Sequence, residues 1–454
     1  MSGTGLSFGT KLKLIRNGSQ ERTLTPIKVS IDGKQLHVTV DTNGLEPGQY
    51  DLLLDGARYT NGVPSPGYLP RAYTVTAPAP VQTGSRFVPA GPSRFLDTRD
   101  GTGAMKQRVG PGGVVTLQVA GGKGIPATGV TAVVMNVTAV HPTEAGHVMV
   151  YPNGQATLKV SNLNFAPGQI VPNLVTVPAV NGKVDLRNNA GSVDLIADVT
   201  GYYTDQAGAG SALNPITPAR FLDTRDGTGT KMQRVGPGGV VTLQVAGVKG
   251  VPATGVTAVV MNVTAVQPTE AGHVTVYPNG QAAPGVSNLN FTPGQIVPNL
   301  VTLPAVNGKV DLRNNSGSVD LIVDVTGYYA ATGSAFSAAG AVRLLDTRDG
   351  TGARAGAVGP GDVVHLQVTG TAGVPAQGVT AVVLNVTVTN PTEASHLIVH
   401  PHGIARPGVS NLNYTPGQTV ANLVVVPVVD GRVTFYNNSG SADVIADLNG
   451  YFTS

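Results

Sequence analysis

The segment LDTRDGTG occurs three times in the chain, at Leu96–Gly103, Leu222–Gly229 and Leu345–Gly352. Each occurrence opens a stretch that closes in D-V-T-G-Y-Y or D-L-N-G-Y-F, and the closing motifs are Asp198–Tyr203, Asp324–Tyr329 and Asp447–Phe452. From the first Asp to the closing Gly is 104 positions in every copy, without a gap, and copies one and two are identical at 91 of 105 positions. A repeat of roughly 110 residues is too long for one turn of a solenoid and suits an independent domain.

Within copy one the strand signals are dense and short. They are FLDTR, VVTLQV, TAVVMNVTAV, GHVMVYP, VSNLNF, LVTVPAV, KVDLRN and VDLIADVTGYY, separated by PGG, PATG, PNG, APG and NG turns. Many short β-branched runs between turn residues are typical of an antiparallel β-sandwich or jelly roll. No stretch carries a helix-period apolar stripe of useful length, so each copy is expected to be all-β.

Residues 1–77 differ from the copies but also contain strand patterns. From Gln35 the chain reads QLHVTVDTNGLEPGQYDLLL, in which an alternating strand passes through G-L-x-P-G-x-Y-D into the next strand. This stretch resembles the TIG/IPT class of immunoglobulin-like domains. The expected architecture is therefore an N-terminal Ig-like domain followed by three tandem antiparallel β-sandwich, jelly-roll-like repeats. The expected domains are 1–77, 92–203, 219–329 and 342–454, joined by small-residue linkers at 78–91, 204–218 and 330–341.

The copies themselves resemble a repeat domain of secreted actinobacterial proteins. The motifs that carry the resemblance in copy one are Arg94–Arg99, Pro142–Pro152, Ser161–Phe165 and Asp198–Tyr203. The resemblance covers roughly 340 of the 454 residues. It implies an exported accessory or surface module, and it carries no established catalytic residues that could be transferred to this chain.

The amino-acid composition excludes several classes of function. There is no Cys and no Trp, which excludes disulfides, thiol nucleophiles and zinc–thiolate sites and leaves no indole platform for sugars. Residues 1–91 hold nine Lys/Arg and six Asp/Glu, and the other 363 residues hold twenty of each, so no basic patch for nucleic acid is expected. The sequence contains no apolar run of about 18 residues, so no membrane span is predicted. The opening MSGTGLSFGT has no charged and apolar signal-peptide regions, which leaves the export route open.

Two residue sets are candidates for ligand binding. In the D-T-R-D-G segment, carboxylates and a guanidinium could bind hydroxyl pairs or a cation, although a turn locked by Asp–Arg pairing is the simpler interpretation. In the S-N-L-N segment, two Asn side chains could bind a glycan, although buried Asn more often satisfies loop backbone groups. The candidates are Asp97, Arg99, Asp100, Asn162, Asn164, Asp223, Arg225, Asp226, Asn288, Asn290, Asp346, Arg348, Asp349, Asn411 and Asn413.

The last strand of copy one carries two carboxylates on one face, Asp194 and Asp198. At about 3.3 Å per residue they stand some 13 Å apart, too far for a glycosidase acid/base pair. One of them is instead expected to pair with an Arg such as Arg94 or Arg99, and we expect Asp198 to bond to the D-T-R segment.

Copy three alone has the sequence H-L-I-V-H-P-H, with His396, His400 and His402 at positions of the same parity. On a straight strand these side chains share one face, so they are a weak candidate for a metal site. No cofactor is expected, and no motif for a nucleophile–base pair or phosphate loop is present.

These observations leave three functions open. The first is a non-enzymatic extracellular adhesion protein whose copies bind a repetitive surface polymer, such as a cell-wall or polysaccharide glycan, by avidity. The second is a structural subunit of a fibre, stalk, sheath or phage-like particle, in which the low-charge copies self-associate. The third is an accessory region of a secreted enzyme. Three near-identical fused active sites would bring an enzyme little, so no catalytic activity is expected.

Overall fold

The computed structural model describes residues 11–16, 19–24, 26–29, 36–38, 48–55, 67–75, 84–155 and 160–454. The chain divides into two compact units, Met1–Gln82 and Thr83–Ser454. All the described elements are β-strands, which confirms the all-β prediction. The described residues contain no helix with the length and apolar character needed to cross a membrane.

The N-terminal unit contains β1 (Lys11–Arg16), β2 (Ser19–Leu24), β3 (Pro26–Val29), β4 (Leu36–Val38), β5 (Gly48–Asp55) and β6 (Gly67–Val75). Four of these strands form one antiparallel sheet in the order β2-β1-β5-β6, and β3 pairs with β4. Leu14 and Tyr50 are fully buried. Residues 39–47, which hold most of the G-L-x-P-G motif, and residues 78–83 of the expected linker lie outside the described residues.

Copy one contains β7 (Arg86–Asp97), β8 (Val114–Gln118), β9 (Val130–Val140), β10 (Gly146–Pro152), β11 (Leu163–Phe165), β12 (Ile170–Pro178), β13 (Lys183–Asn188) and β14 (Asp194–Thr204). Copy two contains β15 (Ala212–Asp223), β16 (Val240–Gln244), β17 (Ala258–Val266), β18 (Gly272–Pro278), β19 (Leu289–Phe291), β20 (Ile296–Pro304), β21 (Lys309–Asn314) and β22 (Asp320–Ala330). Copy three contains β23 (Ala335–Asp346), β24 (Val363–Gln367), β25 (Val379–Thr389), β26 (Ser395–Pro401), β27 (Leu412–Tyr414), β28 (Val420–Pro427), β29 (Arg432–Asn437) and β30 (Asp443–Thr453).

Each copy forms two four-stranded antiparallel sheets. In copy one their strand orders are β12-β9-β14-β7 and β11-β10-β13-β8, and copies two and three repeat both orders. Side chains from both sheets meet in one apolar cluster, in which Leu96, Val137 and Leu186 are fully buried. Equivalent clusters lie in the other two copies.

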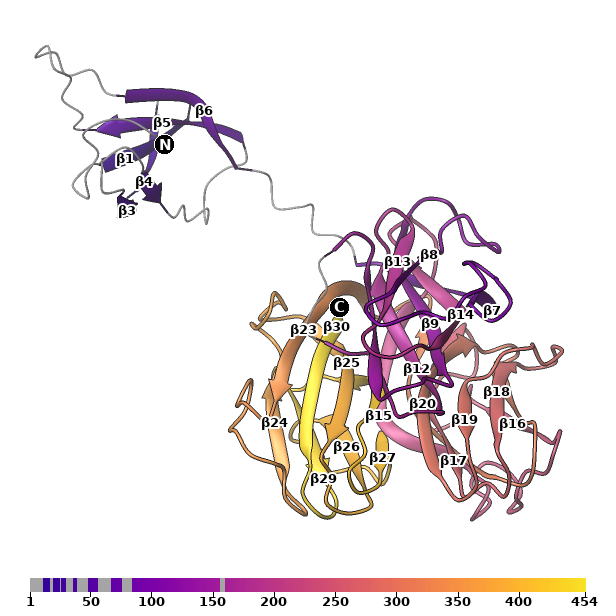
Figure 1. Ribbon diagram of the computed structural model, residues 1–454. Helices are drawn as coiled ribbons and strands as arrows, with labels where there is room; N and C mark the ends of the chain where they lie inside the picture. Colours follow the sequence, from indigo (N-terminus) through magenta and orange to yellow (C-terminus); the bar gives the residue numbers. More distant parts are fainter. Residues whose placement is uncertain are drawn as a thin grey trace, which may run out of the picture. The chain divides into compact units, whose positions relative to one another are not determined.

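The prediction of an Ig-like domain followed by three tandem β-sandwich repeats is wrong. The chain instead forms six small antiparallel sheets of four strands, two from each copy, in a six-bladed β-propeller arrangement. The three copies lie side by side (Figure 1) and share one apolar core. The N-terminal unit shows one four-stranded sheet and a separate strand pair in its described residues, rather than an Ig sandwich.

The physical reason for this error lies in strands such as β9 (Val130–Val140). In a β-sandwich each sheet has one face in solvent, but β9 is buried on both faces from Ala132 to Val140. On one side it packs within its own copy. On the other side, Ala132 and Val134 join a fourth apolar cluster that is shared by all three copies. A strand buried on both faces reads as a continuous apolar run, as TAVVMNVTAV does.

The backbone closes the three copies into a ring. Phe87 of copy one pairs with Ser211 of copy two, Leu213 of copy two pairs with Ser334 of copy three, and Phe336 of copy three pairs back with Ser85. The segments expected to be soft linkers therefore contain strand. β15 (Ala212–Asp223) and β23 (Ala335–Asp346) begin inside them, because these segments carry the pairs that close the ring.

Buried asparagine side chains also close the ring, because each of them hydrogen-bonds to the next copy. The Asn136 amide of copy one donates to the Ser287 carbonyl of copy two at 2.9 Å, and its oxygen accepts a 2.8 Å hydrogen bond from Asn299. Asn262 makes the same two bonds to copy three. Asn385 makes them back to copy one. Buried Asn was expected to satisfy loop backbone, and it does so across the boundary between copies. Asn136-Val-Thr138, which matches a glycosylation sequon, is buried here and not on an exposed loop.

Aromatic side chains fill one end of the shared core. The Phe87 and Tyr329 rings stack with centroids 4.6 Å apart, and those of Tyr203 and Phe336 with centroids 4.0 Å apart. The Tyr203 and Tyr329 hydroxyls share a 2.6 Å hydrogen bond. Copy three has Phe452 at the equivalent position, so no third hydroxyl is buried without a partner.

Candidate functional site

The D-T-R-D-G candidates form a tight turn held together by its own charges. Asp97 is 1% exposed and accepts hydrogen bonds from the Arg99 side chain at 2.9 and 2.7 Å and from the Arg99 backbone N–H at 3.0 Å. Asp100 accepts a 2.8 Å bond from the Thr102 N–H. Gly103 has φ of 68°, and a Cβ there would lie 2.0 Å from the Phe95 carbonyl oxygen, so only glycine fits. The same turn recurs at Asp223, Arg225, Asp226 and at Asp346, Arg348, Asp349.

Arg94 joins this turn to the last strand. Its Nε donates to Asp198 at 2.9 Å, and its Nη1 donates to Asp97 at 2.9 Å. The predicted pairing of Asp198 with an arginine such as Arg94 is confirmed. The predicted bond to the D-T-R segment itself is not found, because Arg94, which precedes that segment, links Asp198 to Asp97. Burial raises the pKa of Asp198 in spite of the hydrogen bond from Arg94. Burial also opposes ionisation of Asp97, but the hydrogen bonds from Arg99 outweigh it, and the pKa of Asp97 lies below its ordinary value.

The S-N-L-N candidates divide into two roles. The Asn162 oxygen accepts a 2.7 Å bond from the Val150 N–H, and Asn288 and Asn411 do the same in their copies. These three side chains are structural. The second Asn lies on the short strand β11 (Leu163–Phe165) or its equivalent, half-buried, at Asn164, Asn290 and Asn413. Asn290 and Asn413 accept bonds from Ser287 and Ser410.

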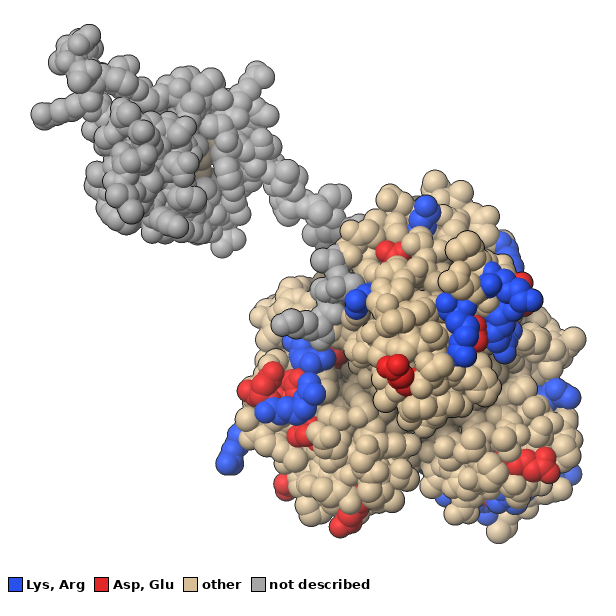
Figure 2. All heavy atoms as spheres, in the orientation of Figure 1, with Lys and Arg blue, Asp and Glu red and all other residues tan. Residues whose placement is uncertain are grey.

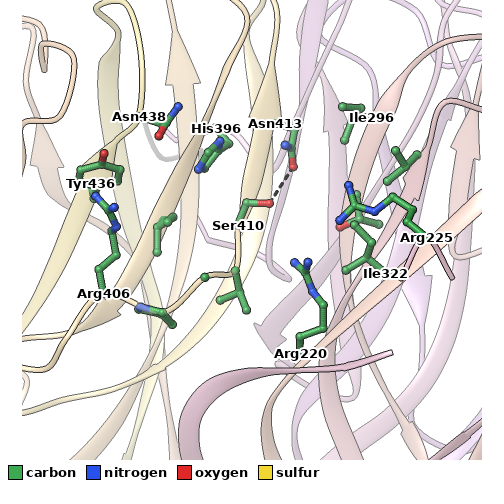
Figure 3. A pocket seen from close by; sticks show the side chains of 16 residues that line it. Arg220, Arg225, Ile296, Ile322, His396, Arg406, Ser410, Asn413, Tyr436 and Asn438 are labelled. Carbon is green, nitrogen blue, oxygen red and sulfur yellow. Dashed lines mark hydrogen bonds between the residues drawn. The ribbon is translucent and has the colours of Figure 1, made fainter. Parts of the chain in front are cut away.

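A cleft of about 290 Å³ lies between copies two and three (Figure 3). Copy two supplies Arg220, Arg225 and the apolar Ile296 and Ile322. Copy three supplies polar side chains from its loop and outer sheet, namely His396, Arg406, Ser410, Asn413, Tyr436 and Asn438. The structure thus brings two of the predicted candidate types, the D-T-R arginine and the second Asn, together from different copies.

The cleft has cationic groups on both walls. Arg225 is about half exposed and shares Asp223 with Arg220, which also binds Asp324. On the opposite wall, the Arg406 guanidinium carbon lies 3.8 Å from the centroid of the Tyr436 ring. Arg406 makes no ion pair with any described residue. Over the face shown in Figure 2 most of the surface is uncharged, and the lysines and arginines gather in a few groups.

The three candidate metal histidines do not come together. His396 lies in the cleft, His400 is 6% exposed with its Nδ1 2.9 Å from the Pro401 carbonyl, and His402 contacts His365 with ring centroids 4.7 Å apart. Among the described residues no group of three or more His, Asp or Glu side chains is placed to hold a metal ion. The shared parity failed as a guide because Pro401 ends the strand before His402.

Sequence reasoning missed Arg220, Arg406 and Tyr436 as site residues. The repeat itself held a usable signal, because Arg406 and Tyr436 differ from the residues at the same positions of both other copies. That signal could not show which copy faces which.

No protein-family model matches this sequence, and no curated protein is significantly similar to it. Among solved structures, a chain from the atomic structure of Sulfolobus Turreted Icosahedral Virus is 9% identical, with a TM-score of 0.17, over 76% of this chain and 83% of that one. A chain from an archaeal virus, described by its triple jelly roll fold and turret assembly, is 9% identical, with a TM-score of 0.18, over 81% of this chain and 90% of that one.

Proposed function

We propose that residues 84–454 are a non-enzymatic extracellular recognition unit that binds a repetitive surface polymer, such as a cell-wall or polysaccharide glycan. The observation that carries the proposal is the closed ring. It sets three equivalent boundaries between copies around one centre, and the boundary between copies two and three holds a cleft with guanidinium, imidazole, amide and apolar groups.

The ring holds the three copies at fixed positions, whereas tandem repeats joined by mobile linkers would bind a polymer with variable spacing. Because the copies share backbone pairs, amide bonds and an apolar core, the three boundaries keep constant spacing. Binding to a polymer with regularly spaced sugars then costs less entropy at the second and third contact than binding through mobile linkers.

The test is retention of the full chain on isolated bacterial cell walls and on immobilised polysaccharides. We expect retention on at least one polymer, and a much weaker affinity for single sugar units of that polymer. No retention on any wall preparation, or equal affinity for polymer and single unit, would overturn the proposal.

The alternative role, a structural subunit of a fibre or sheath, is favoured by the low share of charged residues, 12%, and by the largely uncharged face seen in Figure 2. It has to use a surface other than the one between copies, since ring closure occupies that surface within each molecule. Light scattering and negative-stain microscopy over a range of concentrations separate the roles. Filaments favour the structural role, and a strictly monomeric chain favours recognition.

A further inference from the structure

We propose that the clefts between copies bind an anionic group carried on a sugar ring, a carboxylate or a phosphate, and that one arginine from each copy is the main contact. This proposal rests on the proposed recognition function and names the ligand chemistry of that site. It arises from the charge inventory of the cleft between copies two and three and from a substitution pattern among the copies.

One of the three arginines that line the cleft has no carboxylate partner among the described residues. Asp223 and Asp324 are 1% and 2% exposed, and both are engaged by Arg220 or Arg225. Arg406, an exposed side chain, has no carboxylate partner among the described residues. The cleft is lined by three guanidinium groups and, within the described part of the chain, by no carboxylate. Asp223, Asp324 and the exposed Asp226 act on Arg220 and Arg225, so an anion entering the cleft meets the unpaired charge of Arg406.

Arg406 is also held in a geometry suited to an anion. Its guanidinium carbon lies 3.8 Å from the centroid of the Tyr436 ring, and His396 lines the same cleft (Figure 3). Stacking on an aromatic face restrains the planar group and leaves its N–H edge free to donate two parallel hydrogen bonds to a carboxylate or phosphate.

The copies keep this arginine but change where it comes from. Copies one and two have Arg187 and Arg313 at the strand position of Tyr436, and in the aligned sequences Thr157 and Ala283 correspond to Arg406. The most divergent copy has thus lost the strand arginine and gained a loop arginine. The loop arginine stacks on the residue that replaced the lost one.

All three arginines lie beside the same histidine of their copy. Burial and then the charge of this arginine lower the pKa of that histidine, in the pairs His147 with Arg187, His273 with Arg313 and His396 with Arg406. Arg187 and Arg313 are half-buried and Arg406 is exposed, and none of the three forms an ion pair with a described residue. An ion pair within the fold therefore does not explain why each copy carries this charge.

The remaining lining of the cleft fits a sugar ring. Ile296 and Ile322 provide apolar surface, while Asn413 and Asn438 provide amide groups that can bond to hydroxyls. A volume of about 290 Å³ accommodates one ring and its charged substituent, not a longer oligosaccharide.

The test uses the full chain and three soluble probes: polygalacturonate for carboxylates, poly(glycerol phosphate) for phosphodiesters, and dextran as the neutral polymer. The test variant is Arg187→Gln/Arg313→Gln/Arg406→Gln. The matched control is Lys106→Gln/Lys231→Gln/Arg354→Gln, which removes the same charge from exposed positions, one in each copy, that do not line the cleft between copies two and three.

We expect the unaltered chain to bind one or both acidic polymers more tightly than dextran, and the probe preferred identifies carboxylate or phosphate. The test variant should lose about tenfold in affinity, as removal of bidentate guanidinium contacts implies, whereas the control should change by less than about twofold. Circular dichroism confirms that each variant is folded. No preference for either acidic polymer overturns the proposal, and so does an equal loss in the control variant, which would indicate unspecific charge attraction.

Retention on cell walls distinguishes this proposal from the proposed function. If the test variant is retained on walls as well as the unaltered chain is, binding of anionic groups in the clefts is refuted while the recognition function stands. If acidic polymers bind through the three arginines but no wall retains the protein, the recognition function fails while the cleft chemistry stands.

Discussion

Replacement of Asn385 by alanine tests whether the ring of copies is closed in solution. The Asn385 amide donates to the Ser161 carbonyl at 2.7 Å and accepts a 2.9 Å bond from Asn173, at a position that is 1% exposed. Both partners belong to copy one, more than 200 residues earlier in the chain. In an open row of three repeats this side chain would have no partner from copy one.

The expected cost follows from the bonds lost. Two hydrogen bonds disappear, each worth about 1 kcal/mol net, and the Ser161 carbonyl loses a donor at a part-buried site, so the change should cost roughly 2–4 kcal/mol. Asn136→Ala and Asn262→Ala remove the equivalent bonds at the other two boundaries and should cost the same. Asn438→Ala is the control, because Asn438 is exposed and its side chain hydrogen-bonds only to the Ser439 hydroxyl among the described residues.

Urea unfolding of the full chain measures these free energies. The midpoint should fall by a similar amount for the three buried variants at unchanged slope, and the Asn438 variant should stay within about 0.5 kcal/mol of the unaltered chain. If Asn385→Ala behaves like the control while Asn136→Ala is destabilised, copy three does not close onto copy one and the ring is refuted.

Three further perturbations probe the copies and their junction. Asp198→Ala removes the carboxylate that Arg94 binds and should lower the free energy of unfolding by about 2–3 kcal/mol in urea; an unchanged midpoint would show that the pair does not stabilise the fold. Burial raises the pKa of Tyr203 and Tyr329 above the ordinary value of 10.0, so the unfolded chain releases these protons first. The free energy of unfolding should therefore keep this contribution below about pH 10 and lose it as the pH rises further. The loss should be smaller in the variant Tyr203→Phe/Tyr329→Phe. A urea midpoint that stays constant up to about pH 11 would contradict this expectation. Copy two expressed alone as residues 211–330 exposes its face of the shared core and should form homotrimers in sedimentation experiments; a folded monomer at high concentration would argue against the shared core.

The candidate site was only partly accessible from the sequence. The Asp–Arg turn and its link to Asp198 could be predicted, because these residues are close in the chain or join neighbouring strands of one copy. The cleft could not, because Arg225 and Asn413 meet only when copy two and copy three face each other. The bond between Asn136 and Ser287 could not be predicted either, because the two residues are 151 positions apart and belong to different copies.

Local pattern was sufficient for the strands, the turns, the threefold repeat and the absence of thiol chemistry. Those features depend on residue spacing and on interactions within about 110 residues, which the repeat displays directly. The association of the copies depends on a second apolar face, carried by residues such as Val134 and Leu174. A buried face has the same composition whether its partner lies in the same copy or in the next one. Only the tertiary structure therefore decided that three repeats close into one ring, and with it where the clefts lie.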